Sequence, residues 1–107
     1  MKAVIFENKT LEIIKEFPND ARQRIGYQLD RVQRDLEPEN WKPFNMVGQG
    51  VREIRIQVGM QYRIIYVAKF NNAIHVLHAF QKKTQKTRQS DIDRAKLAYK
   101  ELERKYR

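Results

Sequence analysis

The sequence predicts an α+β domain with the element order β-α-α-β-β-β-α and a mostly antiparallel sheet. Three strand-like segments, 51–58, 61–70 and 73–81, follow one another with two residues between neighbours. Such short connections favour antiparallel pairing of consecutive strands. Segments with helical periodicity stand on either side of this run, two before it and one after it. Helices are therefore expected to cover the sheet.

The N-terminal segments supply the first strand and two helices. Residues 2–7 are rich in apolar side chains and predict a short strand. Apolar residues then recur at helical spacing until Pro18, which ends the first helix. Either Asn19 or Asp20 can cap a second helix, whose apolar stripe is Ala21, Ile25, Leu29, Val32 and Leu36. We expect these two helices to cover one face of the sheet.

The remaining segments are a loop and a C-terminal helix. Residues 39–50 contain a proline and two glycines, which predict a loop, and Trp41 and Phe44 are expected to pin this loop over the core. Ser90 is expected to cap the last helix, with Asp93 three residues later in a capping-box position. The apolar stripe of that helix is Ile92, Ala95, Tyr99, Leu102 and Tyr106.

Length and composition indicate a single domain over residues 1–107. The absence of cysteine excludes disulfide bonds, thiolate metal sites and a cysteine nucleophile, and it suits a reducing cytoplasm. The N-terminal apolar run, residues 3–6, is too short for a signal peptide or a membrane span. We therefore expect a cytoplasmic protein that does not bind a membrane.

The net charge of +9 comes from the second half of the chain. Residues 1–50 carry 8 Lys/Arg and 8 Asp/Glu, residues 51–80 carry 4 and 1, and residues 81–107 carry 10 and 4. The last segment alone therefore has a charge of +6. A neutral half beside a basic half is typical of a protein that binds phosphate groups on one surface. The alternative explanation is that the excess positive charge only keeps the protein soluble.

Alternation along the strands divides their residues between a core face and a polar face. In the first of the three strands, Glu53, Arg55 and Gln57 are expected on the polar face. Arg63 lies in an otherwise apolar strand that also carries two tyrosines. Because a buried guanidinium without an anionic partner is too costly, Arg63 must bind either Glu53 on the neighbouring strand or a phosphate group. The pattern favours neither partner.

The three strands lack the ligands of a metal-dependent nuclease. His75 and His78 differ by three positions and are expected on opposite faces, and Glu53 is the single carboxylate in residues 51–80. Because a two-metal nuclease needs several acidic ligands, we expect no metal ion and no other cofactor. The Arg, Lys, His and Tyr side chains that remain suit RNA cleavage in which the substrate's own 2′-hydroxyl attacks the adjacent phosphate.

Such cleavage requires a group that stabilises charge on the phosphorane and groups that move two protons. Arginine suits the first task, because it stays cationic and donates in a fork. A lysine in the field of neighbouring cations can act as a base, and Lys82 and Lys83 would meet this condition near Arg63. A histidine or a tyrosine is a further candidate for proton transfer.

Four stretches of the sequence together resemble one family. They are "VREIRI" (51–56), "QYRIIYV" (61–67), "HVLHAFQKKTQKT" (75–87) and "SDIDRAKLAYKEL" (90–102), and they resemble the RelE/ParE toxin superfamily. The likeness is closest to its phage-derived, HigB-like branch, in which a Phe-x-Lys-Lys-Thr-x-Lys-Thr motif follows the last strand. That motif is here Phe80, Lys82, Lys83, Thr84, Lys86 and Thr87. Where the branch often has proline next, this chain has Arg88.

The resemblance implies a RelE-like fold and the toxin of a type II toxin–antitoxin pair, acting as a ribosome-dependent mRNA endonuclease. It also implies a cognate antitoxin, in this branch usually a helix-turn-helix protein. We expect the catalytic residues to be Arg63, Lys82, Lys83 and His78, and the substrate-binding residues to be Arg55, Lys86 and Arg88. Two other functions remain open: a ParE-like toxin that inhibits gyrase without nuclease activity, and a passive RNA-binding module.

Overall fold

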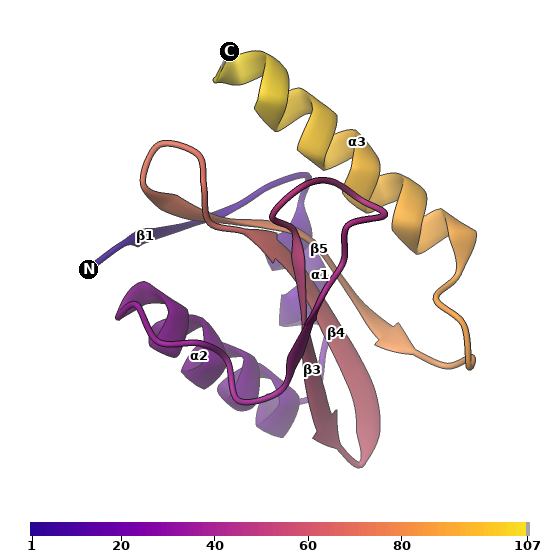
Figure 1. Ribbon diagram of the computed structural model, residues 1–107. Helices are drawn as coiled ribbons and strands as arrows, with labels where there is room; N and C mark the ends of the chain where they lie inside the picture. The colour runs from indigo at the N-terminus through magenta and orange to yellow at the C-terminus, as the bar shows by residue number, and fades with distance from the viewer. Residues whose placement is uncertain (107) are drawn as a thin grey trace.

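The computed structural model describes residues 1–106, which form a mixed α+β fold with a five-stranded sheet and three helices (Figure 1). The elements are β1 (Ala3–Phe6), α1 (Thr10–Lys15), α2 (Asn19–Gln33), β2 (Trp41–Pro43), β3 (Arg52–Val58), β4 (Met60–Val67), β5 (Ala73–Lys82) and α3 (Gln89–Lys105). The predicted class is therefore confirmed. The elements follow the predicted order with one addition, the short strand β2.

The sheet has the strand order β1-β5-β4-β3-β2. Strands β3, β4 and β5 pair antiparallel with their sequence neighbours, as predicted. Strand β1 pairs parallel with β5, so that β5 lies between β1 and β4. All of β5 is buried except its last two residues, Gln81 and Lys82. The chain therefore leaves the core at the point where the basic segment begins.

Two segments differ from the predicted strand pattern. Residues Trp41–Pro43, which we expected in a loop, form the edge strand β2 and pair with β3. An edge position tolerates a proline, because its missing N–H is not needed for pairing. Strand β4 ends at Val67 rather than at residue 70, and Asn71 and Asn72 adopt positive φ angles of 52° and 50° in the turn that leads to β5.

Helices cover both faces of the sheet (Figure 1). Helices α1 and α2 pack on one face, where Ile14, Ile25 and Leu29 join a core with apolar residues of β3, β4 and β5. The expectation that the two N-terminal helices share a face is confirmed. Helix α3 packs on the other face, where Tyr99 belongs to a second core. A Cβ atom at Gly48 would lie 2.5 Å from the Tyr99 ring, so this glycine lets the loop before β3 approach α3.

The two aromatic residues expected to pin the loop have different positions. Phe44 packs against the core beneath α3, as predicted. Trp41 lies at the edge of the sheet, where the guanidinium of Arg52 stands 4.0 Å from the centroid of its ring. Trp41 therefore orients a cation rather than covering the core.

The helices begin without the capping residues that the sequence predicted. The position before α2 is Pro18, whose carbonyl accepts a hydrogen bond from the backbone N–H of Arg22 (3.0 Å), and no side chain caps the helix. Proline is favoured near helix starts because its φ angle already suits the helix. Arg88 precedes α3, so Ser90 lies inside the first turn. Leu36 lies beyond the end of α2 and is 50% exposed rather than buried.

A β-bulge in β5 overturns the expectation that His75 and His78 lie on opposite faces. Ile65 pairs with His78 and Tyr66 pairs with Val76, so Leu77 is an extra residue in β5. An extra residue shifts the alternation by one position. Both histidines therefore face α3: His75 lies 5.9 Å from Tyr106, measured between ring centroids, and His78 contacts Asp91.

Candidate nucleic-acid interface

Helix α3 covers only part of its face of the sheet, and the uncovered part is polar. In this region Arg55 pairs with Arg63, Gln57 pairs with Gln61, and Gln61 pairs with Lys82 on the next strand. Directly opposed residues of neighbouring strands point to the same side of a sheet. These five side chains therefore form one surface, which we call the open face.

Glu53 links the two arginines at the centre of the open face. Two arginines directly opposite each other would repel, but the Oε1 atom of Glu53 lies 3.2 Å from Arg55 Nε and 3.9 Å from Arg63 Nε. The shorter contact is a hydrogen bond donated by Arg55. The longer one is an ion pair without a hydrogen bond. Glu53 is itself buried, so its charge acts on both guanidinium groups in a poorly solvated place.

Arg63 is held at the floor of the open face, where only 6% of its surface is exposed. Its Nη1 atom donates to the backbone carbonyl of Tyr62 (3.1 Å), and its Nη2 atom donates to the Gln61 side chain (2.8 Å). Its Nε atom is buried and has no hydrogen-bond partner among residues 1–106. Burial lowers the pKa of Arg63, an effect that Glu53 opposes and Arg55 reinforces. The side chain is thus fixed in position, with its Nε–H group unpaired.

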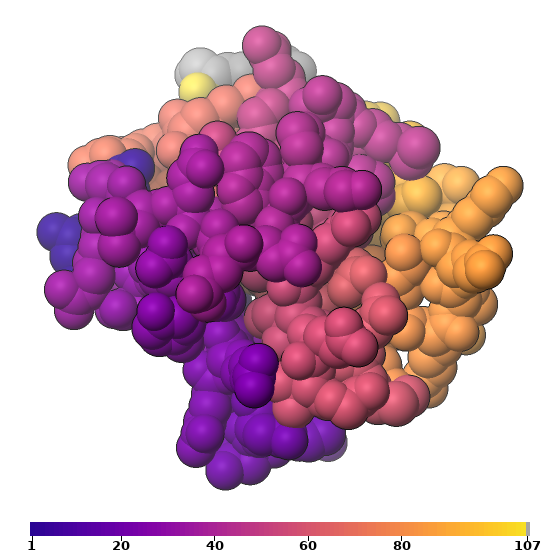
Figure 2. Space-filling model, turned by 60° about the horizontal axis from the view of Figure 1, so that its bottom comes forward, coloured from indigo at the N-terminus to yellow at the C-terminus, as the bar shows by residue number. Residues whose placement is uncertain are grey.

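Two hollows adjoin the open face. The first, of 190 Å³, is lined by Arg55, Arg63 and neighbours that include Asn40. The second is a groove of 690 Å³ between the tip of the β3–β4 hairpin and the segment after β5, lined in part by Lys82 and Lys83. Figure 2 shows the surface hollowed between these two segments. Gln57 and Gln61 line both hollows, so the two hollows form one continuous surface.

The segment between β5 and α3 carries the other predicted cations. Lys83, Lys86 and Arg88 are all exposed. Arg88 lines a narrow recess that it shares with Lys82 and Lys83. Lys86 lines neither of the two hollows beside the open face. The structure therefore brings Arg55, Arg63, Lys82 and Lys83 together beside the open face, places Arg88 next to the two lysines in a separate recess, and leaves Lys86 outside all three.

His78 lies beside this region but does not line either hollow. It is 2% exposed, its ring stacks on Phe80 with 5.6 Å between the ring centroids, and its Nε2 atom lies 2.8 Å from Asp91 Oδ1. Burial lowers the pKa of His78, and the carboxylate of Asp91 opposes this effect. A neutral ring that donates from Nε2 satisfies this geometry. The contact ties β5 to the first turn of α3, on either side of the basic segment.

A comparison with known protein families identifies the family of this chain. Residues 12–100 match the family described as "Phage derived protein Gp49-like (DUF891)", and this match covers most of the 107 residues. The chain belongs to this family. Gp49-like proteins are toxins of type II toxin–antitoxin systems and are related to the RelE-like toxins. No curated protein matches the sequence.

The match includes every residue predicted for the site of this Gp49-like toxin, and the family implies a cognate antitoxin. The open face offers arginine, glutamine and lysine side chains with one carboxylate, and residues 1–106 contain no cluster of three His, Cys, Asp or Glu side chains suited to a metal ion. Within the same residues, no helix is long and apolar enough to cross a membrane.

The prediction for the toxin's site omitted three amide side chains that line the hollows: Asn40, Gln57 and Gln61. Strand alternation had placed Gln57 on the polar face beside Arg55, and the same count applied to β4 places Gln61 with Arg63. This signal was therefore present in the sequence. Asn40 lies before β2, and its backbone carbonyl accepts a hydrogen bond from Arg55 N (2.8 Å). No pattern indicated this contact, because β2 was not predicted.

Proposed function

We propose that this Gp49-like toxin is an mRNA endonuclease of the HigB-like type that cuts ribosome-bound mRNA without a metal ion. The observation that carries the proposal is the position of Arg63. Its guanidinium is almost buried, is fixed by two hydrogen bonds and keeps its Nε–H group unpaired, beside a groove lined by Lys82 and Lys83. A fixed cation of this kind stabilises charge that develops on a phosphate without having to reorganise during the reaction.

The proposed reaction forms a bond between the 2′-oxygen of one nucleotide and its own 3′-phosphorus. The bond from that phosphorus to the 5′-oxygen of the next nucleotide then breaks. Lys82 or Lys83 takes the proton of the 2′-hydroxyl and a proton returns to the departing 5′-oxygen, so the products are a 2′,3′-cyclic phosphate and a 5′-hydroxyl. Arg63 binds the non-bridging oxygens of the phosphorane, and Arg55 holds the RNA strand. Because His78 is buried against Asp91, its proposed role is to position the basic segment.

The ribosome, in the cytoplasm, supplies the orientation that this small surface lacks. The open face has few groups that could hold a particular RNA sequence. Residues 81–107 carry a charge of +6, which favours contacts with ribosomal RNA phosphates that weaken as salt rises. The partner that silences the toxin is proposed to be a helix-turn-helix antitoxin, as is usual in the HigB-like branch.

A translation reaction with purified components tests this proposal. The toxin is added to programmed ribosomes and, separately, to the same mRNA without ribosomes, and the new 5′ ends are mapped. We expect cuts in phase with codons in the first reaction and almost none in the second. Equal cleavage of protein-free mRNA at the same positions would refute ribosome dependence. Intact mRNA combined with a failure of gyrase to supercoil DNA would show the ParE-like activity instead.

A further inference from the structure

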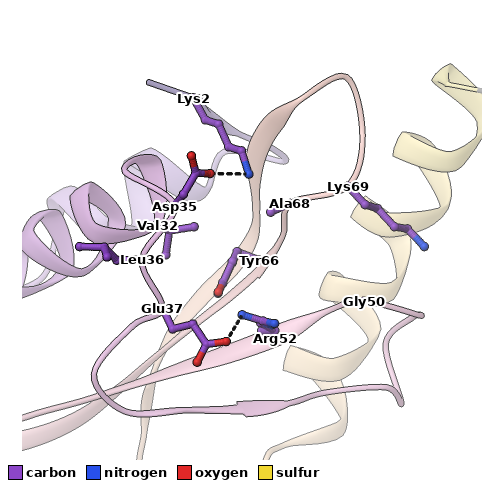
Figure 3. Close-up of a pocket in the computed structure, with 10 residues that line it drawn as sticks. All are labelled: Lys2, Val32, Asp35, Leu36, Glu37, Gly50, Arg52, Tyr66, Ala68 and Lys69. Atoms are coloured by element: carbon purple, nitrogen blue, oxygen red, sulfur yellow. Dashed lines mark ion pairs between the residues drawn. The ribbon is translucent and has the colours of Figure 1, made fainter.

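A second polar pocket lies on the opposite face of the sheet from the open face. It has a volume of 280 Å³, lies where the end of α2 meets β3 and β4, and shares no residue with the two hollows beside the open face. Two ion pairs border it: Lys2 with Asp35 (3.1 Å) and Arg52 with Glu37 (3.8 Å) (Figure 3). The charges at its border therefore nearly balance. The proposed nuclease function does not use this pocket.

Tyr66 gives the pocket a buried polar atom without a partner. Its side chain is 1% exposed, and its hydroxyl has no hydrogen-bond partner among residues 1–106. In Figure 3 this hydroxyl points toward Arg52 and Glu37. Burial raises the pKa of Tyr66 and outweighs the opposing effect of Arg52, so the phenol stays protonated at neutral pH and can donate. Because buried hydroxyl groups are almost always paired, this donor is available to an acceptor that enters the pocket.

Arg52 adds a second donor group that is already oriented. Its guanidinium lies over the ring of Trp41, 4.0 Å from the centroid, which restrains the planar fork. Its acidic neighbour, Glu37, stands 3.8 Å away, beyond hydrogen-bond distance. The Glu37 side chain is 65% exposed, so an exposed pair of this kind stabilises the fold little and can be displaced.

From these contacts we infer that the pocket receives the carboxylate of an acidic side chain from a protein partner, and that Glu37 gives way to it. One carboxylate oxygen accepts from the Tyr66 hydroxyl, and the carboxylate also accepts from the fork of Arg52. Leu36, half exposed at the border of the pocket, packs on the methylene groups of a glutamate. The carboxylates of Asp35 and Glu37 disfavour a phosphate dianion at the same place. The cognate antitoxin is the partner that the family provides, and the net charge of +9 attracts an acidic one.

The test uses two amino acids with blocked termini, one with a charged side chain and one with a neutral side chain, and nuclear magnetic resonance of the full chain at constant ionic strength. The blocked amino acid N-acetyl-glutamate N-methylamide should shift the Arg52 Nε–H signal and the Tyr66 amide signal in a saturable manner. The matching glutamine compound should not. Tyr66→Phe should weaken binding of the glutamate compound about tenfold, the loss expected for one hydrogen bond to a charged group. Glu37→Gln should strengthen it, because the competing carboxylate is gone.

Tyr27→Phe is the matched control, because it removes the same hydroxyl from a tyrosine that is 53% exposed on α2, and it should change nothing. Tyr66→Phe should melt at the same temperature as the unchanged protein or higher, since its hydroxyl is unpaired in the free chain. Equal shifts with both compounds, stronger binding of inorganic phosphate, or unchanged binding in Tyr66→Phe would each overturn the inference. None of these experiments measures RNA cleavage, so the result does not depend on the nuclease proposal.

Discussion

Arg63→Ala separates a catalytic role of the buried arginine from a structural one. The substitution removes the hydrogen bonds to the Tyr62 carbonyl and to Gln61. Glu53 keeps its closer partner, Arg55, at 3.2 Å, so no buried carboxylate is left without a cation. We therefore expect a decrease of about 1–3 kcal/mol in the free energy of unfolding, the range for an unpaired buried polar group, and a protein that still folds.

The loss of activity should be much larger than the loss of folded protein. Removal of one preorganised donor to a developing charge typically lowers the rate about 10²–10³-fold. Arg63→Lys should restore little of this rate, because an ammonium group cannot reproduce the planar fork that donates to two acceptors and leaves Nε free. Binding to the antitoxin should persist in both variants, because their fold is retained.

Single-turnover cleavage on programmed ribosomes, measured beside thermal melts, gives the activity per folded molecule. Arg34→Ala is the matched control: it removes an arginine whose side chain is 58% exposed just after the C-terminal end of α2, where it pairs with Asp30. It should cleave at the normal rate. If Arg63→Ala melts at a lower temperature but cleaves normally per folded molecule, Arg63 holds Glu53 in the structure and has no part in the reaction.

Three further predictions concern other parts of the chain. Lys82→Ala and Lys83→Ala should slow single-turnover cleavage more than they weaken ribosome binding; a loss confined to binding that shrinks at low salt would mean that the lysines only contact RNA. Because burial lowers the pKa of His78 below 6.5, the stability of the folded protein should decrease as the pH falls below about 6.5 and level off below the folded pKa, and chemical denaturation of His78→Gln should show a flatter profile there. Gly48→Ala should lower the free energy of unfolding by about 1–3 kcal/mol, because its Cβ would meet the α3 tyrosine ring at 2.5 Å. Gly26→Ala, with no atom within 4 Å in the middle of α2, should raise it by about 0.5–1 kcal/mol; melts that move both glycine variants in the same direction would contradict this contrast.

Local signals were enough to predict the α+β class and much of the open face. The two-residue connections around the central hairpins predicted the antiparallel meander, and period-two alternation placed Glu53 and Arg55 together on its polar face. The same reasoning left two partners for Arg63. The structure gives a carboxylate that is close but too far for a hydrogen bond, at 3.9 Å. Only the folded geometry could supply that distance.

The errors came from features that depend on tertiary contacts. Strand β2 contains a proline and has no apolar alternation, and its pairing with β3 places it at the edge of the sheet. Ser90 has the side chain of a helix cap, but α3 starts at Gln89, after Arg88, two residues before the start that a cap at Ser90 would give. Leu36 continues the apolar spacing of α2, although the helix has already ended at Gln33. In each case the local sequence pattern is present, but contacts with neighbouring segments determine where the strand or helix begins and ends.

The bulge at Leu77 divides β5 into two parts, and even-numbered residues face opposite sides of the sheet in the two parts. Before it, the even-numbered residues Ile74 and Val76 face α1 and α2; after it, Phe80 and Lys82 pair with Arg63 and Gln61 of the open face. An uninterrupted strand would direct Lys82 toward the N-terminal helices. Deletion of this one residue would remove the bulge and leave residues 78–82 opposite their present partners on β4, so Leu77 is the position at which β5 can change its length without moving Lys82 away from Arg63.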